Sequence, residues 1–330
     1  MQTTLKKTVI KSTASTHFKN EVDLGLSATV KYLPSKYFYD KKGDAIFVEI
    51  MNMPEYYLTN AEYDIFKNKT QDLISVLKIN HKTDFDLIEL GAGDGTKTKE
   101  LLKVLDNQGF KFTFLPVDIS KNALSQLEST IHVELPNIKI NTKQGDYFNV
   151  LEDIKTYEKP KVLLFLGSNI GNLSDAKAAE FLKKLSTALH ENDKVVLGVD
   201  LIKPKHIVLP AYHDAQGITS RFNLNLLERI NRELDADFNL DMFVHDPEYD
   251  EKEGIAQSFL KSLTTQQVKI GALNKTFILK KGERIHTETS RKYNETVLNA
   301  LLKDSNLKII DKLMDSNNYF ADFILEKIKK

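Results

Sequence analysis

Three glycines within five residues are the part of this sequence best suited to binding a ligand. Gly91, Gly93 and Gly95 follow a short apolar run at 86–90 and precede apolar residues at helical spacing. This order predicts a strand, a tight turn and a helix. Glycine lets the backbone adopt left-handed dihedral angles and lets a ligand approach without meeting a Cβ atom. We therefore expect a small-molecule site at this turn.

Acidic residues follow the glycine turn at a spacing typical of adenosine recognition. Asp118 ends the next apolar run, 25 residues after the second glycine, and a carboxylate there can accept hydrogen bonds from both ribose hydroxyls. Asp146 and Tyr147 follow a third expected strand, where an acid and an aromatic ring can contact adenine. Nicotinamide and flavin enzymes share the glycine pattern, but Glu89, two residues before Gly91, is typical of S-adenosylmethionine-dependent methyltransferases. A glycine-rich turn without a ligand is the alternative.

A sheet must position these side chains, and the middle of the chain predicts one. Strands are expected at 86–90, 112–117, 138–142, 161–166 and 194–199, with helices at 96–106, 120–132 and 174–189. Such alternation predicts an α/β fold with a mostly parallel sheet. The segment 167–172, GSNIGN, follows the fourth strand at the edge where ligands of such sheets bind. A tight turn with local side-chain caps is the other interpretation of this segment.

The strand–helix alternation stops after Asp200. A helical pattern at 218–234 and alternating segments around 255–280 follow, without a further glycine turn. We interpret this stretch as an insertion that forms a second lobe. A helix near 292–303 and strands at 307–312 and 319–328 then close the sheet with an antiparallel edge.

The region before the glycine strand combines a predicted helix with many aromatic residues. Thr59–Glu62 resembles a capping sequence, so a helix is expected at about 61–77. Seven aromatic residues lie between Tyr32 and Tyr57. A packed helix pair would account for them. Tyrosine hydroxyls need hydrogen-bond partners, however, so some of these side chains are equally expected to line a pocket.

Composition excludes several classes of function. The chain has 330 residues with 46 basic and 46 acidic side chains, so it has no net field to attract nucleic acid or an anionic membrane. No apolar run approaches a membrane span, and the N-terminus lacks a secretory signal. Cysteine is absent, and His206, His213 and His245 lack metal-ligand spacing, so we expect surface or hydrogen-bonded histidines. A cytoplasmic protein without a metal is predicted.

Several segments together resemble one family, the histidine Nα-methyltransferases of the ergothioneine pathway. They occur in the family's order over nearly the whole chain, and FLGSNIGN and the run at 211–238 are far more specific than the glycine turn. The matching segments are YFYD (37–40), PEYYLTNAE (54–62), IELGAGDGTKT (88–98), PVDIS (116–120), FLGSNIGN (165–172), AYHDAQGITSRFNLNLLERINRELDADF (211–238) and TETSRKY (287–293).

The resemblance implies a Class I S-adenosylmethionine-dependent methyltransferase, Rossmann-like, with a second α+β lobe that binds the substrate. It implies methylation of the α-amino group of L-histidine, up to the trimethylated product hercynine. Nothing in the sequence indicates a dimer interface, so a monomer is expected. The implied domains are a substrate lobe at 1–60 plus 202–286 and a cofactor domain at 61–201 plus 287–330. The implied cofactor residues are Gly91, Lys97, Asp118, Asp146 and Tyr147, and the implied histidine-facing residues are Tyr39, Tyr56, Asn172, Tyr212, Glu288 and Ser290.

Each histidine-facing residue suits a physical role. Asn172 and Tyr212 can donate hydrogen bonds to the amino acid's carboxylate. Glu288 and Ser290, two apart on an extended segment, can hold the two imidazole nitrogens. The amine's proton is expected to pass to water or to Tyr39, and no other residue suggests itself as the base. Tyr39 and Tyr56 can also face the amine with aromatic rings, which tolerate its growing positive charge.

The sequence departs from the family at one place. The family often packs a methionine on the histidine ring from the segment that corresponds to 255–262, and the nearest residue here is about Ser258. A serine in place of that methionine changes the shape of the pocket without changing the chemistry. Methylation of another amino acid or small amine is therefore the alternative function. A non-catalytic binding protein is a further alternative.

Overall fold

The computed structural model describes residues 16–328 and divides into two compact units. The insertion unit combines the chain up to Tyr56 with Pro204–Ser290, and the sheet unit combines Tyr57–Lys203 with the chain from Arg291 onward. The boundaries expected from the sequence differ from these by two to four residues. One consequence is that Glu288 and Ser290 belong to the insertion unit, not to the cofactor domain in which the sequence placed them.

An eight-stranded sheet forms the centre of the sheet unit. Its order is β13-β14-β6-β5-β1-β2-β3, and β4 also pairs with β2. Strands β1 to β6 pair in parallel, and β14 is antiparallel to both β6 and β13. The strands are β1 (Phe85–Leu90), β2 (Phe112–Asp118), β3 (Lys139–Ile140), β4 (Lys143–Gln144), β5 (Lys161–Phe165), β6 (Lys194–Asp200), β13 (Leu307–Met314) and β14 (Phe320–Lys327).

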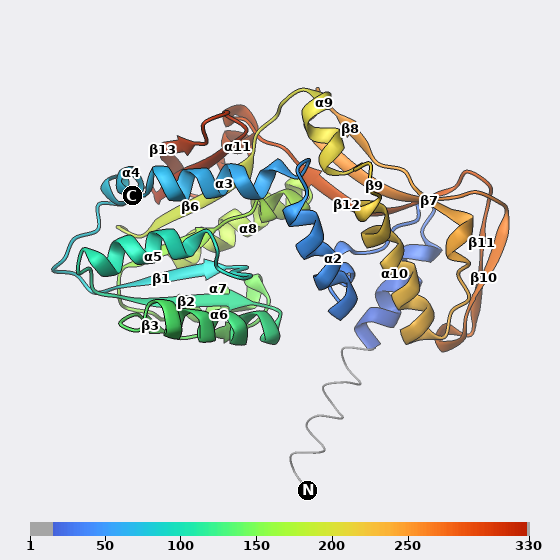
Figure 1. Cartoon of the computed structure of the whole chain (residues 1–330), viewed down its shortest axis with the longest axis horizontal. Helices are drawn as coiled ribbons and strands as arrows, with labels where there is room; N and C mark the ends of the chain where they lie inside the picture. The colour runs from blue at the N-terminus through green and yellow to red at the C-terminus, as the bar shows by residue number, and fades with distance from the viewer. Residues whose placement is uncertain (1–15, 329–330) are drawn as a thin grey trace, which may run out of the picture. The chain divides into compact units, whose positions relative to one another are not determined.

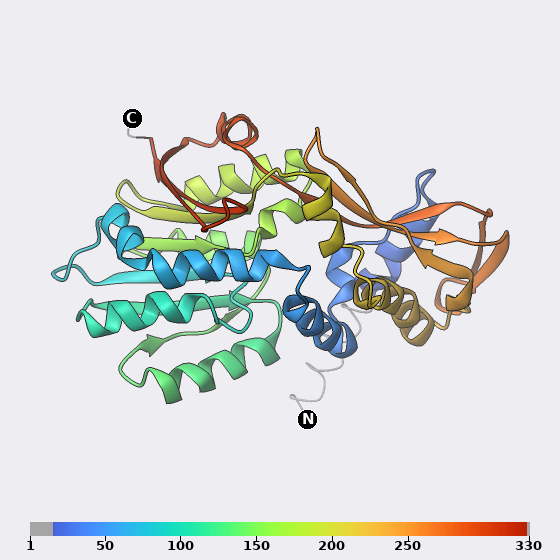
Figure 2. The same cartoon turned by 45° about the horizontal axis from the view of Figure 1, so that its top comes forward.

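Helices cover both faces of this sheet (Figures 1 and 2). Successive side chains of a buried strand point to opposite faces, and Leu87 and Ile88 of β1 accordingly belong to different cores. One core includes side chains of α7, α8 and α11, and the other includes side chains of α4, α5 and α6. The helices are α3 (Tyr57–Asn68), α4 (Thr70–Leu77), α5 (Thr98–Asn107), α6 (Lys121–Glu134), α7 (Tyr147–Ile154), α8 (Asp175–Ala188) and α11 (Glu295–Leu302).

These elements confirm the predicted α/β alternation and the antiparallel closing strands. The strand expected at 138–142 is interrupted and forms β3 and β4, and helix α7 was not predicted. The single helix expected at 61–77 is wrong, because α3 begins at Tyr57 and α4 begins at Thr70. Glu62 therefore lies inside α3 rather than in a capping box, and its side chain is fully buried.

The insertion unit packs helices α2 and α10 with small antiparallel sheets around a core of its own. One sheet has the order β12-β9-β7, with β8 also paired to β9, and β10 pairs with β11. Its elements are η1 (Ser35–Phe38), α2 (Lys41–Asn52), α9 (Lys205–Val208), η3 (Leu209–Ala211), α10 (Ile218–Leu234), η4 (Leu240–Met242), β7 (Phe243–His245), β8 (Glu248–Asp250), β9 (Ile255–Ser262), β10 (Gln266–Ile270), η5 (Gly271–Leu273), β11 (Lys275–Leu279) and β12 (Arg284–Arg291).

Helix α10 has the bounds that the periodicity predicted. Asp214 accepts hydrogen bonds from the backbone N–H groups of Ile218 and Thr219, both at 2.8 Å, so it satisfies two of the free donors at the helix start. The helix ends at Asp235, which has a left-handed backbone conformation. No helix of residues 16–328 combines the length and apolarity that a membrane span needs.

Candidate active site

The glycine turn of the sheet unit has the conformation that its glycines allow. Gly91, Gly93 and Gly95 all have positive φ, at 76°, 54° and 66°. A Cβ atom added to Gly91 would lie 2.6 Å from the hydroxyl oxygen of Tyr147. A Cβ atom added to Gly93 would meet nothing within 4 Å, so the backbone there faces open space. A ligand can therefore reach the peptide groups of the turn.

Asp118 connects the glycine turn to the end of β2. Its carboxylate accepts one hydrogen bond from the N–H of Gly93 at 3.1 Å and another from the N–H of Ser120 at 2.8 Å. Its backbone carbonyl accepts a hydrogen bond from the N–H of Gly145 at 3.0 Å. The side chain is partly exposed, and each carboxylate oxygen can accept a second hydrogen bond. Asp118 thus holds the turn and still has acceptor capacity for ribose hydroxyls.

Tyr147 lies beside this turn, and Asp146 precedes it at the start of α7. The ring of Tyr147 packs edge-on against Phe165 at 5.3 Å between centroids. Burial raises the pKa of the Tyr147 hydroxyl, with a smaller contribution from the carboxylates of Asp118 and Asp146, so this hydroxyl is a neutral donor. Asp146 is exposed and accepts a hydrogen bond from the N–H of Phe148 at 3.0 Å, which makes it the cap of α7.

Lys97 forms an ion pair with Glu62, a residue that the sequence did not identify as part of the site. Both carboxylate oxygens of Glu62 also accept from the N–H of Gly167, at 2.9 Å each. Burial lowers the pKa of Lys97, but attraction to Glu62 outweighs that effect, so the pKa lies above its ordinary value. The only sequence signal for Glu62 was its place in the segment PEYYLTNAE, where it was interpreted as a helix cap.

Glu89 presents a buried acceptor next to the glycine turn. One of its oxygens accepts a hydrogen bond from the Thr98 hydroxyl at 2.7 Å. The other oxygen is buried and has no partner among the described residues. Burial raises the pKa of Glu89 to about 8. The open backbone at Gly93 and the acceptor capacity of Asp118 are what fit S-adenosylmethionine at this turn.

In the insertion unit, Tyr212 and Ser290 are joined directly. The Tyr212 hydroxyl donates to the Ser290 hydroxyl at 2.8 Å, and both side chains are buried. Thr219 in α10 donates to the backbone carbonyl of Tyr212 at 3.2 Å, so the helix start positions this residue. Glu288 is half-buried on β12, two residues before Ser290, and side chains two apart on a strand share a face.

Tyr39 and Tyr56 belong to an aromatic cluster whose packing partners the sequence did not predict. Both rings contact Phe47 edge-on, at centroid distances of 5.4 and 6.4 Å. Phe222 of α10 contacts Tyr39 at 5.8 Å and Phe47 at 5.9 Å. Tyr39 is 38% exposed. The contacts show the packed arrangement that was one of the two expectations, and the lining of a pocket by these tyrosines stays a prediction.

Asn172 belongs to the sheet unit, whereas the other predicted substrate residues belong to the insertion unit. It is exposed at the end of η2 (Asn169–Asn172) in the sheet unit. Ser168, before η2, has a left-handed φ of 56°, so the turn at the end of β5 is a constrained one. Gly171 has no room for a side chain, because an added Cβ would lie 2.7 Å from the carbonyl oxygen of Arg291.

The structure changes the interpretation of Ser258. Side chains of β9 alternate, and Ser258 is buried on the core face with Ala256 and Leu260. Gln257 and Phe259 point to the opposite face. Phe259 contacts His286, edge-on at 5.3 Å, on β12 two residues before Glu288. Gln257 rather than Ser258 is therefore the residue of β9 on the face that Glu288 shares.

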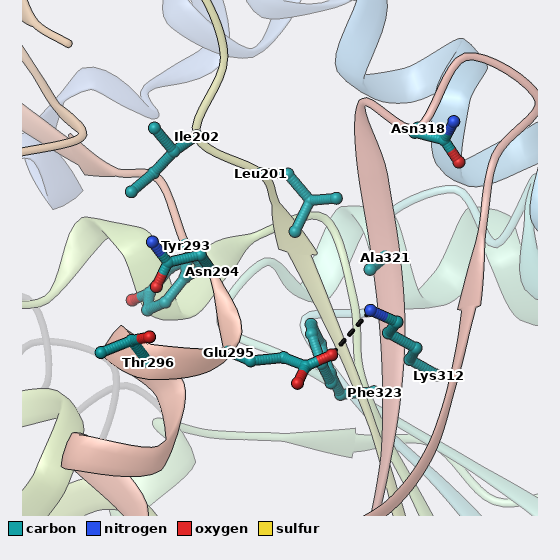
Figure 3. Close-up of a pocket in the computed structure, with 10 residues that line it drawn as sticks. All are labelled: Leu201, Ile202, Tyr293, Asn294, Glu295, Thr296, Lys312, Asn318, Ala321 and Phe323. Carbon is teal, nitrogen blue, oxygen red and sulfur yellow. Dashed lines mark hydrogen bonds and ion pairs between the residues drawn. The ribbon is translucent and has the colours of Figure 1, made fainter. Parts of the chain in front are cut away.

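Two further features of the described residues have no connection to the predicted site. A cavity of about 400 Å³ in the sheet unit lies between the start of α11 and the antiparallel strands, with Glu295 and Lys312 paired at 2.6 Å beside it (Figure 3).

His245 is buried without a partner for either ring nitrogen among the described residues, and burial lowers its pKa to about 4, so it is not the hydrogen-bonded or surface residue expected. Among residues 16–328, no three His, Cys, Asp or Glu side chains form a metal-binding group.

The parallel sheet with its antiparallel closing strands, the left-handed glycine turn and Asp118 define an S-adenosylmethionine-dependent methyltransferase of Class I. Residues 18–327 match a family described as histidine-specific methyltransferase, SAM-dependent, and the chain belongs to this family.

Relatives of known name support this assignment. The chain is 35% identical to the histidine N-alpha-methyltransferase of Mycobacterium tuberculosis, over 88% of each chain. It is 35% identical to the protein of the same name from Mycolicibacterium smegmatis, over 89% of this chain and 90% of the relative. It is 30% identical to ergothioneine biosynthesis protein 1 of Neurospora crassa, of which it covers 32%.

Proposed function

We propose that the protein transfers methyl groups from S-adenosylmethionine to the α-amino nitrogen of L-histidine, up to the trimethylated product hercynine. Family membership supports the histidine substrate class. The observation that carries the proposal is the buried hydrogen bond from Tyr212 to Ser290, two residues from Glu288. A pair of this kind suits a neutral imidazole, which has one donor and one acceptor nitrogen.

The hydrogen bond from Tyr212 directs the chemistry of Ser290. The Ser290 oxygen accepts the proton of Tyr212, and we propose that Ser290 contacts one imidazole nitrogen of the substrate. Glu288 then accepts the N–H of the other nitrogen. Tyr212 donates its single hydroxyl proton to Ser290. We therefore propose that Asn172, more than Tyr212, binds the carboxylate of histidine. This is a narrower role for Tyr212 than the sequence suggested.

The aromatic cluster suits the amine end of the substrate. Tyr39 and Tyr56 both pack on Phe47, and an aromatic ring face attracts a cation without binding it as tightly as a carboxylate would. The product gains positive charge as methyl groups accumulate, so rings favour its release. We propose Tyr39 as the acceptor of the amine's proton. Full first-methylation activity in Tyr39→Phe would rule its hydroxyl out.

Residues of the sheet unit hold the methyl donor in this proposal. S-adenosylmethionine supplies a methyl group on a sulfonium, and most of the rate gain in such a displacement comes from alignment. Gly91 gives close approach to the backbone, and Asp118 accepts from ribose. Asp146 and Tyr147 contact adenine, and Lys97 supplies a cation. The enzyme is proposed to be a cytoplasmic monomer without a metal, a nucleic-acid partner or a membrane partner, and its zero net charge supports the last two points.

The test is mass spectrometry of the purified protein incubated with S-adenosylmethionine and each of the twenty amino acids. Histidine heavier by three methyl groups, and loss of that signal in Glu288→Ala, would support both the reaction and the recognition of the ring. Methylation of a different amine with histidine unchanged would favour the second candidate, a methyltransferase for another amino acid. Gln257 is polar and lies on the face that Glu288 shares, and this observation supports a substrate other than histidine as the second candidate.

A further inference from the structure

One fully buried carboxylate connects three segments of the sheet unit. Glu62 projects from α3 and has 0% exposure. It forms the ion pair with Lys97, which immediately precedes α5, and it accepts from the N–H of Gly167 at the end of β5. A buried charge is tolerated only when it is paired and hydrogen-bonded. Glu62 meets both conditions through residues that border the glycine turn and the end of β5.

A second buried carboxyl group lies beside Glu62. Asp322 of β14 is the direct partner of Gly198 in β6. A Cβ atom added to Gly198 would lie 2.1 Å from one oxygen of Glu62 and 2.9 Å from one oxygen of Asp322. Both carboxyl groups therefore share the space above Gly198, where only a glycine leaves room for them.

These two carboxyl groups need a proton between them. Asp322 is fully buried, and neither of its oxygens has a donor among the described residues. Two carboxyl groups form a hydrogen bond only if one of them is protonated. Burial, and then the charge of Glu62, raise the pKa of Asp322 well above its ordinary value, against the opposing effect of Lys97.

We propose that Glu62 is the positioning residue for Lys97 at the cofactor site, and that a protonated Asp322 donates to Glu62 and leaves a single negative charge opposite the lysine. The inference rests on the proposed role of Lys97 in binding S-adenosylmethionine. A lysine side chain has several rotatable bonds and loses considerable entropy when it is held still. Pairing with a rigid carboxylate places the ammonium group before the ligand arrives and leaves two of its three N–H donors for that ligand.

The variant that tests this inference is Glu62→Gln, because it removes the charge and keeps the shape. Its amide oxygen still accepts from Gly167, and its N–H₂ group still pairs with Asp322, so the fold is expected to persist. Glu100→Gln is the matched control, since Glu100 pairs with Lys103 on the surface of α5. Isothermal titration calorimetry with S-adenosylhomocysteine measures binding in both variants, in Lys97→Met and in the Glu62→Gln/Lys97→Met double variant.

We expect Glu62→Gln and Lys97→Met each to weaken binding by about tenfold or more, as for a lost charged hydrogen bond. The double variant should bind no more weakly than Lys97→Met, because Glu62 acts through the lysine. In turnover, KM for S-adenosylmethionine should rise in Glu62→Gln while KM for histidine stays constant. Wild-type affinity in Glu62→Gln, or multiplied effects in the double variant, would overturn the inference. Wild-type affinity in Lys97→Met would instead overturn the proposed role of Lys97.

A second pair of variants tests the shared proton, whether or not Glu62→Gln folds. Asp322→Asn keeps a permanent N–H donor toward Glu62, and Asp322→Leu removes it with the same branching of the side chain. We expect the asparagine variant to bind S-adenosylhomocysteine at least about tenfold more tightly than the leucine variant. Equal affinities would show that Asp322 does not donate to Glu62.

Discussion

Glu288 shows how one side chain sets substrate choice in this proposal. It is half-buried on β12 near the hydrogen-bonded pair of Tyr212 and Ser290. A site that holds a ring nitrogen with a buried polar group rejects ligands that leave the group unpaired. Recognition of the ring then depends on hydrogen bonding.

The Glu288→Ala variant should lower kcat/KM for histidine by about 100-fold, since a buried hydrogen bond to a charged group contributes about 1.5–3 kcal/mol. Affinity for S-adenosylhomocysteine should not change. Initial rates at varied histidine and calorimetric titration measure the two quantities. Glu228→Ala, which removes an exposed partner of Lys42 in the same unit, is the control. Equal loss of cofactor affinity would indicate misfolding rather than lost recognition.

The raised pKa of Glu89 predicts that the free energy of unfolding depends on pH. Its pKa rises from an ordinary 4.5 to about 8 because of burial, so the folded protein keeps a proton that the unfolded chain has lost between these values. The stabilisation is complete below pH 4.5 and is lost as the pH rises to about 8, at up to about 1.4 kcal/mol per pH unit. Urea unfolding of wild type and Glu89→Gln across this range should show the slope only in wild type. Parallel curves would contradict the assignment.

At the scale of elements, the start of α10 positions two parts of the proposed substrate site. Asp214 caps the helix, and Thr219 binds both the Asp214 carboxylate, at 2.6 Å, and the carbonyl of Tyr212. Further along, Phe222 contacts Tyr39, and Asn223 accepts from the Thr287 hydroxyl at 2.6 Å, one residue before Glu288. One helix therefore aligns the aromatic cluster and the polar residues of β12.

Removing the cap by Asp214→Ala should destabilise the protein by about 1–2 kcal/mol. Because the start of α10 holds Thr219 beside the carbonyl of Tyr212, loosening that turn should lower kcat/KM for histidine as well. Thermal unfolding and initial rates are the measurements. Asp214→Asn keeps an acceptor oxygen and should recover most of both losses, whereas similar defects in the two variants would indicate that the cap is not the cause.

At the scale of the whole molecule, the chain passes between the two units at three places. A single buried carboxylate of the sheet unit binds one residue at or beside each of these crossing points. Asp200 accepts from the Tyr57 hydroxyl at 2.8 Å and pairs with Lys203 and with Lys292, the latter at 2.7 Å. Tyr57, Lys203 and Arg291 border the unit boundaries. Among Asp200, Lys203 and Lys292, positive charge is in excess, because one carboxylate pairs with two lysines.

That excess has a measurable pH dependence. Burial lowers the pKa of Lys203 to about 8, despite the attraction of Asp200. Between this value and the ordinary 10.5, the unfolded chain binds a proton that the folded protein has released. Stability from this group therefore rises with pH in that window, at up to about 1.4 kcal/mol per pH unit. Urea unfolding from about pH 7 to about pH 10 should show this rise in wild type and not in Lys203→Met. A rise of equal size in the variant would contradict the prediction.

The sequence by itself determined the alternating elements, the bounds of α10 and the glycine turn, because local periodicity and glycine spacing depend on nearby residues. It also indicated Asp118 and Tyr147 as neighbours of that turn. It did not predict helix α7, the break between α3 and α4, or the interrupted strand at β3 and β4.

Only the tertiary structure decided the pairings between distant residues. Glu62 with Lys97 and Asp322, and Asp200 with Lys292, are buried polar pairings whose members lie far apart in the sequence. The same fold placed Gln257 rather than Ser258 on the face that Glu288 shares. Strand register and burial set which charges meet and which are protonated. Both are consequences of packing, so residue types and spacing along the chain do not reveal them.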